Sequence, residues 1–278
     1  MPKTWLITGG SRGLGRALCD VVLTAGHNAV VTARRAEELQ QFTARFGAQV
    51  IARALDVTDY RAAVSAAELA VERFGRLDVV ANVAGYGNLA PIEDTSIDDF
   101  RAQIETNLYG AIHLAKAAIP IMRSQRAGHI ITFSSVGGRI GSTGRAAYSA
   151  AKFGVEGFSE VMATEMAPLG VKVTIVEPGG FRTDFAGSST TIADVRADYD
   201  STVGNAARFQ HNYNGKQPGD PVKAAQVILR VASMSDPPLR LLLGSDAVNI
   251  VEKADAAKAA ADKRWRELSI STDFAVKE

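Results

Sequence analysis

Cysteine is almost absent from this sequence of 278 residues, which contains only Cys19. A single cysteine excludes a framework of intramolecular disulfides and suits a reducing compartment, so we expect a cytoplasmic protein. No apolar run reaches the roughly 20 residues that a membrane-spanning helix needs. Met1-Pro2-Lys3 leads directly into a first expected strand, without the features of a secretory signal.

Net charge and metal-binding patterns are equally scarce. The formal net charge is +1, which removes any bulk electrostatic attraction to nucleic acid or to a charged membrane. The histidines share no spacing that is typical of metal ligands, so we expect no metal site; they are His27, His113, His129 and His211. These absences indicate a globular cytoplasmic domain.

Short β-branched apolar runs alternate with longer segments of helical periodicity along the chain. This alternation is typical of a parallel sheet that is covered by helices on both faces. The expected strands are Thr4–Thr8, Asn28–Thr32, Val50–Leu55, Asp78–Ala81, His129–Phe133, Lys172–Glu177 and Arg240–Leu243. The expected helices are Leu14–Ala25, Ala36–Phe46, Tyr60–Phe74, Phe100–Met122, Ala147–Met166 and Pro221–Ala232. We therefore predict an α/β fold with a doubly wound parallel sheet, in which residues 1–278 form a single domain.

The segment of residues 179–219 interrupts this alternation and is rich in Gly, Ser, Thr and Asn. A connection of this length inside a compact domain is usually a functional lid or a disordered insertion, and too few apolar residues occur here for a second core. Four apolar residues recur at helical spacing, so we expect a short amphipathic helix that turns them toward a substrate pocket: Ile192, Val195, Tyr199 and Val203. An extra C-terminal helix is expected over about residues 246–268, with Ser245 or Asp246 as its N-cap.

A glycine-rich turn, Thr8-Gly9-Gly10-Ser11-Arg12-Gly13-Leu14-Gly15, lies between the first expected strand and the first expected helix. Glycines let the backbone approach a pyrophosphate, whose charge is met by amide N–H groups and by the helix N-terminus. A tight turn alone also favours glycine, but the strand–turn–helix context predicts a dinucleotide site of the Rossmann type. The cofactor contacts expected in this turn are Gly9, Ser11, Arg12, Gly13, Leu14 and Gly15.

The end of the second expected strand indicates which dinucleotide binds. A carboxylate about 20 residues after the glycine turn would hydrogen-bond the ribose of NAD, but this sequence has Ala33-Arg34-Arg35 there. A guanidinium group can hold the 2′-phosphate of NADP with two parallel hydrogen bonds, whereas a carboxylate would repel it. Arg34, together with Arg12, therefore predicts NADP(H). The alternative is that Arg34 and Arg35 are solvated loop cations.

Tyr148 and Lys152 are four residues apart in the helix that follows Ser134-Ser135, so both side chains lie on one helix face within reach of a common ligand. With the glycine turn, this pattern resembles the short-chain dehydrogenase/reductase family, in its core branch and NADP-preferring type. The resemblance covers nearly the whole chain in order. It implies the fold predicted above and a family oxidoreductase that moves hydride between a nicotinamide and a carbonyl/alcohol pair.

The other family motifs can be matched position by position. Asp56-Val57 matches the acidic residue on the adenine side, and Asn82-Val83-Ala84-Gly85 matches the N-N-A-G segment with one departure, at Val83. Pro178-Gly179, followed by Thr183, matches P-G-x-x-x-T. The further cofactor contacts that the resemblance implies are Asp56, Val57, Asn82, Ala84, Gly85, Tyr148, Lys152, Pro178, Gly179, Phe181 and Thr183.

The expected chemistry centres on Tyr148. Hydride transfer to a carbonyl builds negative charge on its oxygen, so a proton donor has to stand there, and an ammonium group near Tyr148 would lower the pKa of its phenol from ~10. The resemblance implies that Lys152 also holds the nicotinamide ribose and that Ser135 hydrogen-bonds the reacting oxygen. It further implies that Asn107 organises a water relay to Lys152. The expected catalytic set is therefore Asn107, Ser135, Tyr148 and Lys152.

The apolar residues of the expected lid predict a bulky, hydrophobic ketone, aldehyde or alcohol as substrate, because an apolar wall favours apolar ligands. The substrate contacts expected are Ser135, Tyr148, Tyr86 and Phe185. Two alternatives stay open: an NAD-dependent alcohol dehydrogenase of the same family, and a non-catalytic protein that senses a nucleotide. The resemblance also implies assembly into a homodimer or a homotetramer.

Overall fold

A parallel sheet forms the centre of the molecule. The computed structural model describes residues 2–187 and 189–274. Its strands follow the order β3-β2-β1-β4-β5-β6-β7. Their bounds are β1 (Thr4–Ile7), β2 (Asn28–Ala33), β3 (Val50–Ala54), β4 (Val79–Asn82), β5 (Gly128–Phe133), β6 (Val171–Pro178) and β7 (Arg240–Leu243). All seven predicted strands are confirmed, each to within one residue, and the strand order reverses between β1 and β4, where doubly wound sheets bind their ligands.

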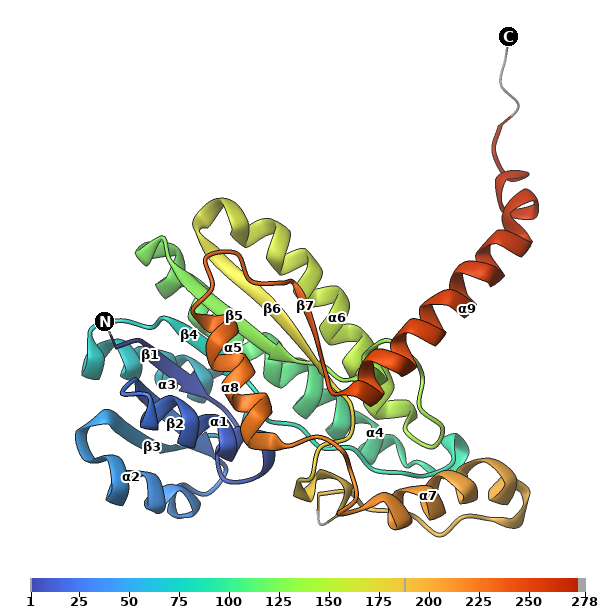
Figure 1. The fold of residues 1–278 in the computed structure, drawn as a ribbon, viewed down its shortest axis with the longest axis horizontal. Coiled ribbons are helices and arrows are strands. Elements are labelled where there is room, and N and C mark those ends of the chain that lie inside the picture. Colours follow the sequence, from blue (N-terminus) through green and yellow to red (C-terminus); the bar gives the residue numbers. More distant parts are fainter. Residues whose placement is uncertain (1, 188, 275–278) are drawn as a thin grey trace.

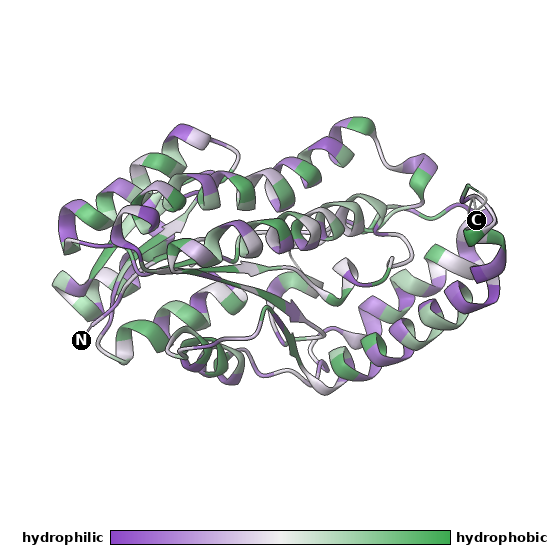
Figure 2. Cartoon of the chain, turned by 90° about the horizontal axis from the view of Figure 1, so that it is seen from above, coloured by the Kyte–Doolittle hydropathy of each residue, from purple (hydrophilic) through white to green (hydrophobic). Residues whose placement is uncertain are grey.

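Helices cover both faces of this sheet, as predicted (Figure 1). Their bounds are α1 (Gly13–Thr24), α2 (Gln40–Phe46), α3 (Tyr60–Phe74), α4 (Ile97–Ile104), α5 (Gly110–Gln125), α6 (Ala146–Met166), α7 (Asn205–Tyr213), α8 (Pro221–Ala232) and α9 (Ser245–Ile270). In Figure 2 the helices lie above and below the sheet, and each carries both hydrophobic and hydrophilic residues.

Successive residues of each strand enter different cores, because side chains alternate between the two faces of a sheet. Trp5 and Ile7 of β1 belong to the core that α1, α2 and α8 cover. Leu6, between them, belongs to the core that α3, α5 and α6 cover. Burial on both faces explains why the strands are continuous apolar runs. Because the strands are parallel, their carboxyl ends lie together at one edge of the sheet.

The long helix predicted over Phe100–Met122 is divided in the structure. Helix α4 begins at Ile97, after Ser96, whose Oγ accepts a hydrogen bond from the backbone N–H of Asp99. A π-helical turn over Glu105–Tyr109 then separates α4 from α5. Such turns widen a helix by one residue and often occur at functional sites. This turn contains Asn107.

The predicted amphipathic lid helix is wrong in its placement. Ile192 and Val195 lie in an extended segment, in which Ile192 forms a parallel bridge with Leu89. A 3₁₀ turn over Asp184–Ala186 precedes this extended stretch, and helical structure resumes at Ala197 and continues through α7 to Tyr213. Val203 is buried beside Gly144, next to Leu89, whereas the side chain of Ile192 is 40% exposed. The backbone bridge at Ile192 and the side chain of Val203 thus attach the segment to the body of the protein.

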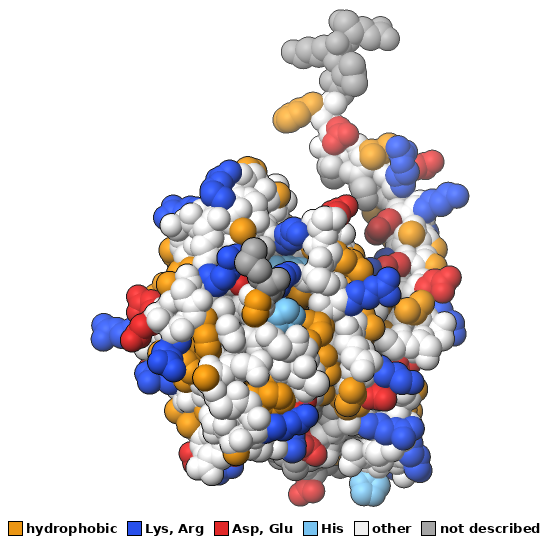
Figure 3. Space-filling view, turned by 60° about the vertical axis from the view of Figure 1, so that its left-hand side comes forward, with side chains coloured by type: hydrophobic (Ala, Val, Ile, Leu, Met, Phe, Trp, Pro, Cys, Tyr) orange, Lys and Arg blue, Asp and Glu red, His pale blue; other side chains and the backbone are white. Residues whose placement is uncertain are grey.

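Helix α9 extends the chain well beyond the sheet (Figures 1 and 3). The predicted C-terminal helix is thereby confirmed, with bounds of Ser245–Ile270, and its N-cap is Gly244 instead of Ser245 or Asp246. Only Ala247 and Val251 of α9 are buried. Within the described residues, no helix combines the length and the apolar character that crossing a bilayer requires.

Candidate functional site

A cleft of about 1080 Å³ opens at the carboxyl ends of the strands. It is bordered by the turn that follows β1 and by the ends of β2 to β6, so it lies across the point where the strand order reverses. Nearly every residue that the sequence marked for cofactor, catalysis or substrate lines it. Among the described residues, no group of three or more His, Cys, Asp or Glu side chains is arranged to hold a metal ion.

The glycine turn has the close packing that its sequence predicts. Gly9 has a φ of +66°, and a Cβ there would stand 3.0 Å from the Cα of Ala84. A Cβ at Gly15 would stand 2.2 Å from the carbonyl oxygen of Gly9. Helix α1 begins at Gly13 without a side-chain N-cap and without acidic residues in its first turn. Its first N–H groups are thus left for an anion at the floor of the cleft.

The threonine before the glycine turn ties two cleft walls together. The Oγ1 of Thr8 accepts hydrogen bonds from the backbone N–H groups of Val83, at 3.0 Å, and of Ala84, at 3.1 Å. This contact brings the segment after β4 against the glycine turn. It explains why a threonine precedes the glycines.

Three guanidinium groups and the carboxylate of Glu38 border the far end of the cleft, around the glycine turn and the end of β2: Arg12, Arg34, Arg35 and Glu38. Arg35 forms an ion pair with Glu38, and hydrogen bonds from Arg35 and Ser11 lower the pKa of that carboxyl group. The predicted arginine cluster therefore stands at the cleft, together with the carboxylate of Glu38.

The four expected catalytic residues come together from three elements. Tyr148 and Lys152 lie on α6, Ser135 follows β5, and Asn107 lies in the π-helical turn. All four line the cleft, and Tyr148 is only 7% exposed. The structure thus gathers residues that are up to 45 positions apart in the sequence.

Burial has the largest effect on the pKa of the Tyr148 phenol, and it raises this pKa. A hydrogen bond with Ser135 and the positive charge of Arg145 act in the opposite direction. The lowering contributions come from Ser135 and Arg145, and the role of Lys152 in lowering this pKa stays a prediction. The Nζ of Lys152 lies 5.6 Å from the centre of the Tyr148 ring and donates its hydrogen bond to the Phe133 carbonyl, at 2.7 Å.

The side chain of Lys152 is also buried. Burial lowers the pKa of its ammonium group to about 8, although the negative charge of Glu156 acts to raise it. A lysine with a pKa this close to neutrality can both take up and release a proton near physiological pH.

Asn107 fastens the segment after β4 to the site. Its Nδ2 donates to the carbonyls of Tyr86 and Gln103, both at 2.8 Å, and its Oδ1 accepts from the backbone N–H of Tyr86, at 3.2 Å. A Cβ on Gly85 would stand 2.6 Å from that Oδ1 and 3.6 Å from the Nζ of Lys152. Asn107 and Lys152 therefore face the same narrow space beside Gly85.

One predicted cofactor contact does not reach the cleft. Asn82 is buried, and its amide donates a hydrogen bond of 3.4 Å to the carbonyl of Ala111 in α5. Its observed contact therefore joins β4 to α5. The predicted substrate contacts Tyr86 and Phe185 do line the cleft, and the Phe185 ring lies 5.6 Å from that of Tyr148.

Several residues at the substrate end carried no sequence signal. Arg145 donates to the Gly87 carbonyl at 2.9 Å, contacts Gln210 of α7 and lies over the Phe185 ring. Asp246 of α9 accepts hydrogen bonds from the N–H of Gly180, at 2.7 Å, and from the hydroxyl of Tyr213, at 3.4 Å. Their partners are far away in sequence, so no local spacing marks them.

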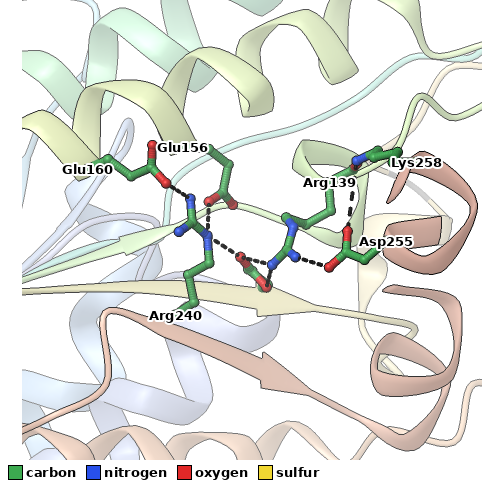
Figure 4. A network of polar contacts seen from close by, with 7 residues as sticks. Arg139, Glu156, Glu160, Arg240, Asp255 and Lys258 are labelled. Carbon is green, nitrogen blue, oxygen red and sulfur yellow. Dashed lines mark hydrogen bonds and ion pairs between the residues drawn. The ribbon is translucent and has the colours of Figure 1, made fainter. Parts of the chain in front are cut away.

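A polar network of charged side chains joins several elements that also carry site residues (Figure 4). Arg240 of β7 pairs with Glu156 and Glu160, two positions on the same helix as Lys152. Arg139, just after Ser135, pairs with the fully buried Glu177 and with Asp255 of α9. The network thus joins α6, the Ser135 segment, two strands and α9.

Comparisons with known proteins agree with this geometry. A family model described as short chain dehydrogenase matches residues 3–193. An oxidoreductase of Botryotinia fuckeliana is 46% identical over 273 residues, which cover 98% of this chain and 100% of the relative. A 3-ketodihydrosphingosine reductase of Bacteroides thetaiotaomicron is 32% identical, over 87% of this chain and 88% of the relative. The crystal structure of a protein from Streptomyces avermitilis, also described as a short-chain dehydrogenase, has a TM-score of 0.92 and 37% identity, and covers 99% of this chain and 100% of its own.

Proposed function

Because the chain belongs to the short-chain dehydrogenase family and is an oxidoreductase of that family, we propose that it interconverts a ketone or aldehyde and an alcohol with NADP(H). The observation that carries this proposal is the convergence of Ser135, Tyr148 and Lys152 on the cleft that the glycine turn also lines. A protein that only sensed a nucleotide would not need this second group of residues.

The residues at the glycine turn fit a dinucleotide. Gly9 and Gly15 leave no room for side chains, and the uncapped N-terminus of α1 offers N–H groups to a pyrophosphate. The resemblance assigns the nicotinamide ribose to Lys152, and further cofactor contacts to Tyr148 and to the segment from Pro178 to Thr183. The bound cofactor supplies the hydride chemistry.

The charge at the far end of the cleft supports NADP over NAD. The 2′-phosphate is a dianion, and three guanidinium groups line this part of the cleft together with two carboxylates, Glu38 and Asp56. Glu38 is already paired with Arg35. Arg12 and Arg34 are exposed and line the cleft, where they can form the charge-assisted bonds that guanidinium groups make with phosphate. Glu38 is the feature that would favour NAD, because a carboxylate can accept hydrogen bonds from an unphosphorylated ribose.

Tyr148 acts as the general acid in reduction. Because burial raises the pKa of its phenol, the hydroxyl keeps its proton at neutral pH and can donate it to the substrate oxygen as negative charge develops there. Ser135 orients the same oxygen by a hydrogen bond. Lys152, with a pKa of about 8, can return a proton to Tyr148, and Asn107 keeps the space beside Gly85 in shape for that transfer.

We further propose that the substrate is bulky and apolar. The support is the aromatic lining of the substrate end, where Tyr86, Phe181 and Phe185 border the cleft. The 3-ketodihydrosphingosine reductase among the relatives is named for a ketone substrate, which agrees with this class. The residues of the expected lid helix give no support, since none of them lines the cleft.

Oxidation of NADPH with a panel of ketones and aldehydes tests the proposal, by comparing the wild-type protein with Tyr148→Phe. The substitution keeps the ring against Phe185 and removes only the proton donor. We expect kcat to fall by about 10²- to 10⁴-fold, the range that general acid catalysis typically contributes, while NADPH still binds. The control is Tyr60→Phe, at an exposed tyrosine on α3, which should retain its activity. A Tyr148→Phe enzyme with most of its kcat would refute the assigned role.

A further inference from the structure

Gln217 is a deeply buried polar residue at the substrate end of the cleft. It follows α7, lines the cleft and is only 1% exposed. In the described part of the chain, neither its Nε2 nor its Oε1 has a hydrogen-bond partner. A buried amide with both of its polar atoms unpaired is rare, because each such atom has lost its water without any compensation.

Most other buried side-chain atoms without a partner lie away from the cleft. Within residues 2–187 and 189–274, the cleft-lining residues with such atoms are Ser134 and Gln217. Ser134 lies close enough to the carboxyl group of Glu156 to lower its pKa, so a group of the protein accounts for its position. The amide of Gln217 is therefore the unsatisfied pair of donor and acceptor at the wall of the cleft.

The position of Gln217 is fixed by its backbone. Its carbonyl accepts a hydrogen bond from the Nε of Arg182, at 2.6 Å. Two residues later, Gly219 donates to the Gly180 carbonyl and accepts from the Arg182 N–H, both at 3.0 Å. These bonds hold the residue beside the Pro178–Thr183 segment, so the side chain is placed by tertiary contacts and not by a free loop.

We propose that Gln217 recognises an uncharged polar group of the bound ligand, to which its side-chain amide donates one hydrogen bond and from which it accepts another. This inference rests on the proposed function, since it needs a ligand at this end of the cleft. An amide matches a carboxamide, or a hydroxyl group, better than it matches an ion, because it carries a donor and an acceptor but no charge. Two sources offer this chemistry: the carboxamide of the nicotinamide, and a second polar group of the substrate.

Gln217→Met tests the proposal because methionine has a similar length and no amide. Gln226→Met, at an exposed position on α8, is the matched control. For the cofactor source, the Kd of NADPH is compared with that of its 3-acetylpyridine analogue, which lacks the amide N–H donor. For the substrate source, kcat/KM is compared for ketones of equal size with and without a second hydroxyl group.

We expect Gln217→Met to lose about tenfold in one of these two comparisons, the change that one buried hydrogen bond typically makes. If the carboxamide is the partner, NADPH binding weakens in the variant, while the analogue, which keeps only the carbonyl acceptor, loses less affinity than NADPH does. If the substrate is the partner, cofactor binding is unchanged and only the hydroxylated ketone loses kcat/KM.

The thermal stability of the ligand-free protein gives a separate measurement. An amide without partners contributes nothing to the fold, so Gln217→Met should keep or raise the Tm. A clear fall in Tm, or a variant equal to wild type in both ligand comparisons, would overturn the proposal. A wild-type protein that binds no nicotinamide at all would instead refute the proposed function, so the two failures are distinguishable.

Discussion

Replacing Lys152 by methionine measures how much stability the fold loses by keeping a cation in its site. Lys152 is 4% exposed, and its ammonium group donates to one backbone carbonyl, that of Phe133. Burial lowers its pKa from 10.5 to about 8 in the folded protein. The unfolded chain exposes the same group to water, where the ordinary value applies. Protonation of Lys152 is thus less favourable in the folded state.

The sign and the size of the effect follow from the two pKa values. Below pH 8 both states hold the proton, and the folded state carries the full penalty of a buried charge. Between pH 8 and 10.5 the folded state has released the proton that the unfolded chain still binds, so stability rises with pH in this window. The two pKa values differ by about 2.5, which corresponds to about 3 kcal/mol in the free energy of unfolding.

Urea unfolding of the wild-type protein and of Lys152→Met, at intervals from pH 7 to pH 10, gives this quantity as a double difference. We expect the methionine variant to gain about 2 to 3 kcal/mol over wild type at pH 7 relative to its position at pH 10. Other titrating groups are common to both proteins and cancel. Lys116→Met, at an exposed position on α5, should unfold in parallel with wild type. A difference between Lys152→Met and wild type that stays flat with pH would refute the argument.

Two further predictions concern the cofactor and the core. Arg34→Ala should weaken NADPH binding by about ten- to a hundredfold and leave NADH nearly unchanged, since it removes one charge-assisted contact; Arg61→Ala on α3 is the control. Equal binding of both cofactors to wild type, measured by titration, would contradict the NADP assignment. Burial lowers the pKa of His129 from 6.5 to about 3, so the unfolded chain takes up a proton here before the folded protein does. The free energy of unfolding therefore falls by about 4 to 5 kcal/mol as the pH falls from 6.5 to 3. In acid unfolding, His129→Gln should lack this loss of stability, whereas His211→Gln, at an exposed position, should follow wild type. Identical acid unfolding profiles for the three proteins would contradict the prediction.

The parts of the fold that the sequence predicts well are those set by neighbouring residues. Helices α3 and α8 have the predicted bounds, Tyr60–Phe74 and Pro221–Ala232. In both, an aspartate just before the helix accepts hydrogen bonds from the first backbone N–H groups: Asp59 in α3 and Asp220 in α8. An N-cap lies next to the residues that it serves, so its effect can be read directly from the sequence.

The π-helical turn and the lid segment show why other parts were missed. The turn adds one residue to a helix that keeps its apolar periodicity, and the contact that accompanies it joins Asn107 to Tyr86. The apolar residues near Ile192 have helical spacing, but hydrogen bonds between Leu89 and its partners Thr191 and Ala193 hold this stretch extended. Pairing across about 100 residues overrides the local preference, and periodicity alone contains no information about it.

The residues of the candidate site also differ in whether local spacing or long-range contacts place them. Tyr148 and Lys152 are found from the sequence because four residues of helix place them on one face, whatever the rest of the molecule does. Arg145 is only three residues before Tyr148, yet its part in the site depends on Gly87, Phe185 and Gln210, which three distant segments supply. Hydride chemistry needs a fixed group of residues, which local spacing can encode. The shape and polarity of the substrate end are instead made by long-range contacts, so this end can differ between members of one family while the catalytic residues stay in register.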